Sequence, residues 1–250
     1  MDLQLQGRGA LVTGASAGIG RAIARQLARE GVRVAVTGRR QEQLESLAAE
    51  IASEGGARPV VIVHDALTGD YVEKVAARAS EGLGSVEILV NNAGGSRAFG
   101  KDATEEQWSE AMTLNFTRHR QLTQRLLPAM IAKGWGRIIN ITGKSEPEGI
   151  NGAFCAKAGI AAWSKGLSRE VGKHGITANC IAPGRIMSDQ IRRNYTPEYR
   201  EWQSEHEIPM GRDGEPEELA DLAVFLASPR AGYITGAVYP VDGGLRRYQY

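Results

Sequence analysis

The sequence is poor in cysteine, in long apolar runs and in excess charge of either sign. Its two cysteines, Cys155 and Cys180, are too few for a disulfide framework and lack metal-ligand spacing. We therefore expect two small core residues, a reducing compartment and no metal site. No run approaches the ~18 apolar residues that a membrane helix requires, and residues 1–9 lack the apolar core of a signal peptide. These absences predict a cytoplasmic protein with no membrane partner.

The charges nearly cancel, since Lys and Arg number 30 and Asp and Glu 29, a formal net charge of +1. A protein that binds nucleic acid through phosphates usually carries a basic excess, so we expect no nucleic-acid partner. Hydrophobic residues make up 42% and charged residues 24%, the usual proportions of a globular protein with a sizeable core. The composition leaves a small-molecule substrate as the expected partner.

Short β-branched runs alternate with longer segments of helical apolar spacing along the chain. The runs that predict strands are 10–13, 33–37, 59–63, 86–90, 136–141, 176–181 and 238–241. Strict alternation of strand and helix predicts a parallel sheet with right-handed crossovers and helices on both faces. We expect an α/β fold of the doubly wound Rossmann type, with about seven parallel strands in a three-layer α/β/α arrangement. No linker or repeat divides the chain, so residues 1–250 are predicted to form one domain.

The segment 187–214 breaks this alternation. It follows the sixth predicted strand, at the carboxyl edge of the sheet, where ligands bind in open α/β folds. We expect it to form a lid over the substrate. Arg192, Arg193 and His206 within it point to a polar or anionic small molecule, although the same residues would also suit packing within the lid.

A glycine-rich turn joins the first predicted strand to the first predicted helix. Gly14 permits a tight turn, Gly18 allows the backbone to approach a pyrophosphate, and Gly20 allows the helix to pack close to the strand. The helix start would present N–H groups and the positive end of its dipole to phosphates. We therefore expect a bound dinucleotide that is also contacted by Ser16 and Ile19.

The second predicted strand runs into Arg39 and Arg40. An acidic residue at this point would hydrogen-bond the ribose 2′-hydroxyl and repel a 2′-phosphate. Two guanidiniums instead suit bidentate contact with a phosphate, although they would also suit a solvated basic turn. We expect NADP(H) as the preferred cofactor, with NAD(H) still possible.

The spacing of the glycine turn, T-G-x-x-x-G-x-G, and the run Asn-Asn-Ala-Gly at 91–94 resemble the short-chain dehydrogenase/reductase family, in its 3-oxoacyl-ACP-reductase-like form. The resemblance covers residues 8–245. It implies contacts with adenine, ribose and nicotinamide from three further segments. The residues implied are Asp65, Ala66, Asn91, Ala93, Gly94, Pro183, Gly184 and Ile186, together with Ser188.

Members of this family usually carry Tyr-x-x-x-Lys on the fifth helix, a serine upstream and an asparagine on the fourth helix. The resemblance implies that Lys157 holds the nicotinamide ribose and that Asn115 anchors a water relay. The family tyrosine protonates the developing alkoxide, but Ala153 stands at its position. Gly143 stands at the position of the serine that hydrogen-bonds the carbonyl.

One hypothesis is a working oxidoreductase that acts on a small carbonyl or alcohol substrate with a non-standard proton donor. Ser145 would then donate a hydrogen bond to the substrate oxygen. Lys157, with its pKa lowered by desolvation or by repulsion from Lys144, is one candidate donor. The other candidates are a polar loop residue, a lid tyrosine or a tyrosine from a neighbouring subunit: Lys144, Glu146, Glu148, Tyr195, Tyr199, Tyr248 and Tyr250.

The alternative hypothesis is a protein that binds NADP(H) without turnover, as a sensor, scaffold or partner subunit. Loss of both the acid and the oxyanion donor would cost on the order of several kcal/mol of transition-state stabilisation. A cofactor-free lyase or dehalogenase on the same fold is disfavoured, because the glycine turn is intact.

The resemblance also implies a homotetramer or homodimer, joined through the fourth and fifth helices and the last strand. Small residues on the fifth helix would suit close contact either between subunits or within one: Ala153, Ala156, Gly159, Ala161 and Ala162.

Overall fold

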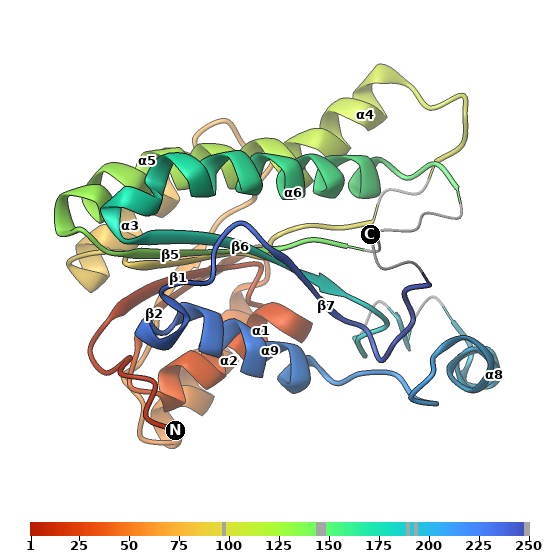
Figure 1. Cartoon of the computed structure of the whole chain (residues 1–250), viewed down its shortest axis with the longest axis horizontal. Coiled ribbons are helices and arrows are strands. Elements are labelled where there is room, and N and C mark those ends of the chain that lie inside the picture. Colours follow the sequence, from red (N-terminus) through yellow and green to blue (C-terminus); the bar gives the residue numbers. More distant parts are fainter. Residues whose placement is uncertain (97–98, 144–148, 189–190, 193–194, 248–250) are drawn as a thin grey trace.

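The computed structural model describes residues 1–250 except 97–98, 144–148, 189–190, 193–194 and 248–250. Seven parallel strands form one sheet in the order β3-β2-β1-β4-β5-β6-β7 (Figure 1). The strands are β1 Gly9–Thr13, β2 Arg33–Gly38, β3 Val60–Val63, β4 Ile88–Asn91, β5 Gly136–Ile141, β6 Ile176–Pro183 and β7 Val238–Val241. The predicted parallel α/β sheet is confirmed.

Helices cover both faces of the sheet. The α-helices are α1 Gly18–Arg29, α2 Gln41–Ser53, α3 Tyr71–Leu83, α4 Glu105–Met112, α5 Arg118–Lys133, α6 Gly152–Val171, α8 Pro197–Glu207 and α9 Pro216–Ala227. Short turns of other helix types are η1 Thr113–Thr117, η2 Gly172–His174 and η3 Pro229–Ala231. Figure 1 shows α3, α5 and α6 on one face and α1, α2 and α9 on the other. Every residue of β1, β4 and β5 is buried, because apolar side chains on both faces of these central strands pack under helices.

Most element bounds agree with the sequence prediction to within one or two residues. The last strand and the fifth strand were predicted with the observed bounds. The sixth strand is longer than predicted, because its final residues Ala182 and Pro183 pair with Pro240 and Val241 of β7. Pairing at the end of a strand with an edge strand does not produce a pattern of apolar residues, so the sequence does not indicate it.

One prediction about the core is wrong. Cys180 is buried in β6, but Cys155 is exposed on α6. The buried stripe of this helix passes through Ala153, Ala156 and Ile160, at helical spacing, and Cys155 lies beside the stripe.

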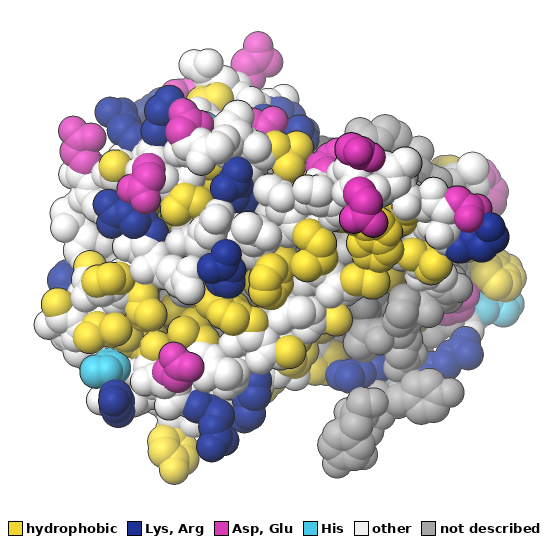
Figure 2. Space-filling view, turned by 90° about the horizontal axis from the view of Figure 1, so that it is seen from above, with side chains coloured by type: hydrophobic (Ala, Val, Ile, Leu, Met, Phe, Trp, Pro, Cys, Tyr) yellow, Lys and Arg dark blue, Asp and Glu magenta, His cyan; other side chains and the backbone are white. Residues whose placement is uncertain are grey.

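The outer surface of the layer formed by α4, α5 and α6 carries a band of hydrophobic side chains (Figure 2). Along α6, Cys155, Ala158 and Ala162 are exposed. In the described part of the chain, no helix has both the length and the apolar character needed to cross a membrane.

The strand order reverses between β1 and β4, so their following loops diverge to opposite faces. In open α/β sheets this switch point opens a crevice at the carboxyl ends of the strands. The fold therefore places the functional site at the ends of β1, β2 and β4. Helix α8 lies beyond the same carboxyl edge, after β6 (Figure 1).

Candidate cofactor and catalytic site

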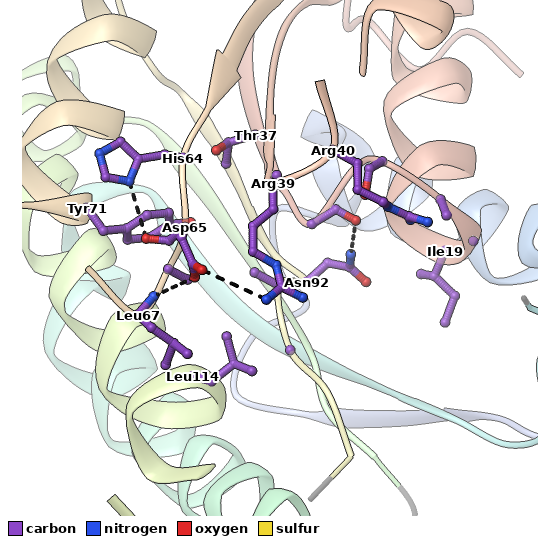
Figure 3. Close-up of a pocket in the computed structure, with 18 of the residues that line it drawn as sticks. Ile19, Thr37, Arg39, Arg40, His64, Asp65, Leu67, Tyr71, Asn92 and Leu114 are labelled. Atoms are coloured by element: carbon purple, nitrogen blue, oxygen red, sulfur yellow. Dashed lines mark hydrogen bonds and ion pairs between the residues drawn. The ribbon is translucent and has the colours of Figure 1, made fainter. Parts of the chain in front are cut away.

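A pocket of about 550 Å³ opens where β1, β2, β3 and β4 end (Figure 3). Most of the residues predicted to bind the dinucleotide line it. They are Gly14, Ser16, Gly18, Ile19, Arg39, Arg40, Asp65, Ala66, Ala93, Gly94 and Ile186. The same lining includes Asn92, His64, Tyr71 and Leu114, which the motif analysis did not assign to the cofactor.

The glycine turn and the loop after β4 hold each other in place. Thr13 Oγ1 accepts hydrogen bonds from the backbone N–H groups of Asn92 and Ala93, each at 2.9 Å. Asn92 Nδ2 donates to the carbonyls of Thr13 and Gly14, at 3.0 and 3.1 Å. Gly14 has a φ of +66°, and a Cβ there would lie 2.8 Å from Ala93 Cα. A side chain at Gly14 would therefore push the two loops apart.

The start of α1 faces the pocket. The N-cap residue Ala17 has no polar side chain to accept from the first N–H groups of the helix. Ala17 and Gly18 line the pocket, so these donors and the helix dipole are directed at a ligand. Gly20 is buried behind the turn, where a Cβ would collide with Asn92 Nδ2 and the Gly14 carbonyl. The predicted roles of close helix packing and phosphate access fit this geometry.

The two arginines after β2 face different parts of the pocket. Arg40 donates from Nε and Nη2 to Ser16 Oγ, at 3.2 and 3.0 Å. Arg39 extends toward Asp65, with 3.8 Å between Nη1 and Oδ2 (Figure 3). Arg40 and Ser16 therefore form a cationic and hydroxyl pair beside the glycine turn. This pair fits a 2′-phosphate, and no acidic residue stands at the end of β2 to repel one.

Arg118 of α5 holds the loop on the other side of the pocket. Its Nε donates to the Ala66 carbonyl and its Nη2 to the Thr68 carbonyl, both at 2.7 Å. Asp65 Oδ1 accepts from the backbone N–H of Leu67 at 3.0 Å, which tightens the same loop. No local pattern marks Arg118, because it lies 50 and 52 residues from the two carbonyls that it binds.

Lys157 of α6 lies between two loops at the edge of the sheet. Its ammonium donates to the Thr142 carbonyl at 3.0 Å. A Cβ on Gly143 would lie 3.2 Å from Lys157 Cδ, and one on Gly94 would lie 3.7 Å from Lys157 Cε. Burial lowers the pKa of Lys157 from about 10.5 to about 8. The predicted effect of desolvation is therefore borne out, and the lysine carries a readily released proton near neutral pH.

Asn115 lies in η1, one turn of π-helix between α4 and α5. Its Nδ2 donates to the Ala111 carbonyl at 2.9 Å and to the Gly95 carbonyl at 3.3 Å, and its Oδ1 accepts from the Gly95 N–H at 3.1 Å. The Asn115 side chain is buried, and π-helical turns of this kind are frequent at functional sites. Asn115 thus fixes the loop that passes Lys157.

At the position of the family tyrosine, the first turn of α6 carries only the methyl group of Ala153. Ala153 is 2% exposed, and its N–H donates to Asn151 Oδ1 at 2.9 Å. Asn151 caps the helix and donates from Nδ2 to Ser96 Oγ at 3.0 Å. The motif analysis missed Asn151, although an asparagine directly before a helix is a recognisable N-cap signal.

His119 is a second residue that sequence reasoning missed. It is buried, and its Nε2 lies 2.6 Å from the Ala93 carbonyl. Burial lowers its pKa to about 4, so the ring is neutral at physiological pH and donates from Nε2. His119 therefore fixes the pocket loop from below and is no proton donor at pH 7.

Five predicted cofactor residues lie outside the pocket lining: Gly20, Asn91, Lys157, Pro183 and Gly184. The Asn91 side chain points into the core, where Nδ2 donates to Thr123 Oγ1 at 3.0 Å and to Asn140 Oδ1 at 2.8 Å. Pro183 ends β6, and Gly184 packs against Asp242.

Most of the alternative proton donors lie outside the described residues: Lys144, Glu146, Glu148, Tyr248 and Tyr250. The predicted hydrogen-bond donor Ser145 lies outside them too. Tyr195 and Tyr199 stack on each other with ring centroids 5.5 Å apart, and neither lines the pocket within the described part of the chain. The described residues also contain no group of three or more His, Cys, Asp or Glu that could hold a metal ion.

Comparison with known proteins gives full-length similarities. A family model described as enoyl-(acyl carrier protein) reductase matches residues 14–246. The 3-oxoacyl-[acyl-carrier-protein] reductase FabG of Aquifex aeolicus is 36% identical, over 98% of this chain and 100% of the relative. Nodulation protein G of a Rhizobium species is 39% identical, over 97% and 98%. L-sorbose reductase from Gluconobacter frateurii, solved with NADPH and L-sorbose, is 31% identical with a TM-score of 0.93, over 99% and 100%.

The chain therefore belongs to the short-chain dehydrogenase/reductase family, a family of NAD(P)-dependent oxidoreductases. The expected fold and the expected class of protein are confirmed.

Proposed function

We propose that this protein is an NADP(H)-dependent oxidoreductase that acts on a small carbonyl or alcohol substrate, with Lys157 as the proton donor. The whole chain is taken as one dinucleotide-binding domain, and residues 187–214 as the lid over the substrate. The observation that carries the proposal is the Lys157 ammonium, held on the Thr142 carbonyl with a pKa of about 8 beside two positions without side-chain bulk.

The cofactor pocket supports NADP(H) at this site. The glycine turn and the start of α1 suit the pyrophosphate, and Arg40 with Ser16 suits the 2′-phosphate. A relative of 31% identity was solved with NADPH. When bound, the nicotinamide would supply or accept the hydride.

Lys157 has the properties that a donor requires. A general acid works best with a pKa near the working pH, and such catalysis contributes ~10²–10⁴-fold. An ammonium has three N–H groups, so it can keep its bond to Thr142 and still donate elsewhere. Gly143 and Ala153 lack the serine hydroxyl and the tyrosine phenol that the family usually has at these positions. We propose Ser145 as the hydrogen-bond donor to the substrate oxygen and Asn115 as the anchor of a water relay.

The second candidate is a protein that binds NADP(H) without turnover. It is favoured by Ala153, which is buried and has only a methyl group where a phenol would donate the proton. Among the described residues, no hydroxyl is hydrogen-bonded to the Lys157 ammonium.

A two-stage measurement separates the candidates. NADPH binding is followed by its fluorescence, and NADPH oxidation is then followed by absorbance with a panel of ketones, aldehydes and imines. Turnover that is abolished in Lys157→Ala and reduced in Ser145→Ala supports the first candidate. Tight binding without oxidation of any substrate supports the second. Turnover that survives Lys157→Ala refutes the proposed donor.

We also propose a cytoplasmic homotetramer or homodimer joined through the outer surface of α5 and α6. The hydrophobic band over this layer in Figure 2 and the exposed Ala158 and Ala162 support it. Ala153 and Ala156 are buried within the subunit, so they are not part of this proposed interface. Light scattering of Ala158→Glu, which should lower the mass of the assembly, tests the proposal. An unchanged mass would refute this interface.

A further inference from the structure

Arg185 is an almost buried arginine with a poorly satisfied guanidinium. Its side chain is 11% exposed, yet its Nε and Nη2 have no hydrogen-bond acceptor in the described part of the chain. The Asp213 carboxylate lies 3.7 Å from Nε, beyond hydrogen-bond distance. Asp213 Oδ1 lies closer to Ser204 Oγ, from which it accepts at 3.3 Å. Two buried donors of a cation are thus left open.

Arg137 shows how this protein satisfies a buried arginine that has only a structural role. Its Nε donates to the Ser228 carbonyl at 3.1 Å, and its Nη1 donates to the carbonyls of Gly136 and Gly175 at 2.8 and 3.1 Å. Its guanidinium also lies over the Trp135 ring. Backbone carbonyls surround one guanidinium and are missing from the open edge of the other. Since buried donors without an acceptor are costly, and the Asp213 carboxylate lies beyond hydrogen-bond distance, the open edge of Arg185 indicates an absent acceptor, for which an anion is suited.

Arg185 lies beside the lid. Its guanidinium lies 4.8 Å from the centre of the Tyr195 ring. Arg200 of α8 contacts Met187 of the same lid, with Nη1 3.7 Å from the sulfur, and its buried Nε also has no partner among the described residues. The segment after β6 therefore carries two arginines with unsatisfied buried donors.

The chain brings Arg185 to the edge of the sheet that carries Lys157. Thr142, which binds the Lys157 ammonium, donates from its N–H to the Ile181 carbonyl of β6 at 2.9 Å. Arg185 follows Ile181 by four residues, past the end of the same strand. Ile186, the next residue, lines the cofactor pocket.

We propose that Arg185 forms a subsite for the carboxylate of the substrate, so that the reaction is between an oxo acid and the corresponding hydroxy acid. Nε and Nη2 share one edge of the guanidinium and match the two oxygens of a carboxylate in a bidentate contact. The inference rests on the proposed oxidoreductase function and names its substrate class.

The test compares acids with neutral analogues of the same shape. Pyruvate, 2-oxobutanoate, acetoacetate and levulinate are each paired with their primary amide, and NADPH oxidation gives kcat/KM. The wild type should prefer at least one acid over its amide by about tenfold or more. The Arg185→Gln variant should lose this preference, because its kcat/KM should fall for the acid and stay unchanged for the amide. Arg169→Gln, which removes an exposed charge from the last turn of α6, outside the lid, should keep the preference.

Equal use of every acid and its amide by the wild type overturns the subsite. So does a loss in Arg185→Gln that is the same for acid and amide, since a purely structural tether would act on both. Arg185→Lys should restore part of the preference, because it keeps the charge and loses the bidentate edge.

A binding measurement keeps the subsite distinct from the proposed function. Calorimetric titration of the NADP⁺ complex with the same four acids should show binding that Arg185→Gln weakens about tenfold or more. Arg185-dependent binding without any turnover would refute the oxidoreductase function and uphold the subsite. Turnover without a preference for acids would uphold the oxidoreductase function and refute the subsite. If the protein shows neither acid binding nor acid preference, the subsite is also refuted.

Discussion

The two halves of the site differ in how completely their side chains are engaged. In the dinucleotide half, Thr13 and Asn92 join two loops with four hydrogen bonds, and Arg40 is already paired with Ser16. In the catalytic half, Ala153 and Gly143 stand where the family has a phenol and a hydroxyl. The chain therefore keeps the residues suited to cofactor binding and lacks the usual family groups for proton donation, so the two properties can be tested separately.

Lys157→Ala tests that separation with the largest expected effect. Removal of the proposed donor should lower turnover by about 10²–10⁴-fold, while the pyrophosphate and 2′-phosphate contacts remain. Stopped-flow absorbance and NADPH fluorescence measure the two properties on the same sample. Lys165→Ala, an exposed lysine of the same helix, is the control and should change neither. An equal loss of binding and turnover would show that the halves are coupled.

The pH dependence of reduction sharpens the assignment of the donor. The pKa of Lys157 is lowered to about 8, and only the protonated ammonium can donate. The rate should be constant below about pH 7 and fall by roughly tenfold per unit above pH 8. Initial rates between pH 6 and 10 measure this, with NADPH saturating. A rate that rises with pH through this window would exclude an ammonium donor.

Arg40→Gln should change only the dinucleotide half of the site, by weakening NADPH binding. Loss of a charge-assisted contact should weaken NADPH binding by roughly 10- to 100-fold and leave NADH binding unchanged. Arg33→Gln removes the same charge from the opposite end of β2 and serves as the control. Equal weakening for both cofactors would mean that Arg40 supports the turn instead of reading the 2′-phosphate.

Arg118→Ala should have the smallest effect. The adenine-side loop would lose two hydrogen bonds from the guanidinium to the carbonyls of Ala66 and Thr68. Affinity for 2′,5′-ADP should fall roughly threefold to tenfold, measured by calorimetry. Arg125→Ala, an exposed position on the same helix, should leave it unchanged. Unaltered affinity in Arg118→Ala would show that the loop keeps its conformation without these hydrogen bonds.

The sequence predicted those parts of the molecule that depend on neighbours along the chain. The parallel strands, the glycine turn and the basic pair after β2 follow from period, backbone freedom and charge within a few residues. The lowered pKa of Lys157 was also within reach, because a lysine on an apolar helix at a sheet edge is desolvated.

Contacts between distant segments could not be predicted in the same way. Arg118 and His119 bind carbonyls 26 to 52 residues away, and nothing local marks them as part of the pocket. Asn91 was assigned to the cofactor from its motif, but its amide completes a polar chain through Thr123 and Asn140. The exposure of Cys155 depended on which face of α6 meets the sheet, and a helix that is apolar nearly all round does not specify that face.

The lowered pKa of Lys157 makes the stability of the folded protein depend on pH in the alkaline range. Its pKa is about 8 in the folded chain and about 10.5 when the chain is unfolded, so between these values the unfolded state holds the extra proton. Stability from this group is therefore lowest below pH 8 and increases as the solution is made more basic, up to about pH 10.5. The proposed reaction needs Lys157 in its charged form, whereas burial in the folded protein favours its neutral form.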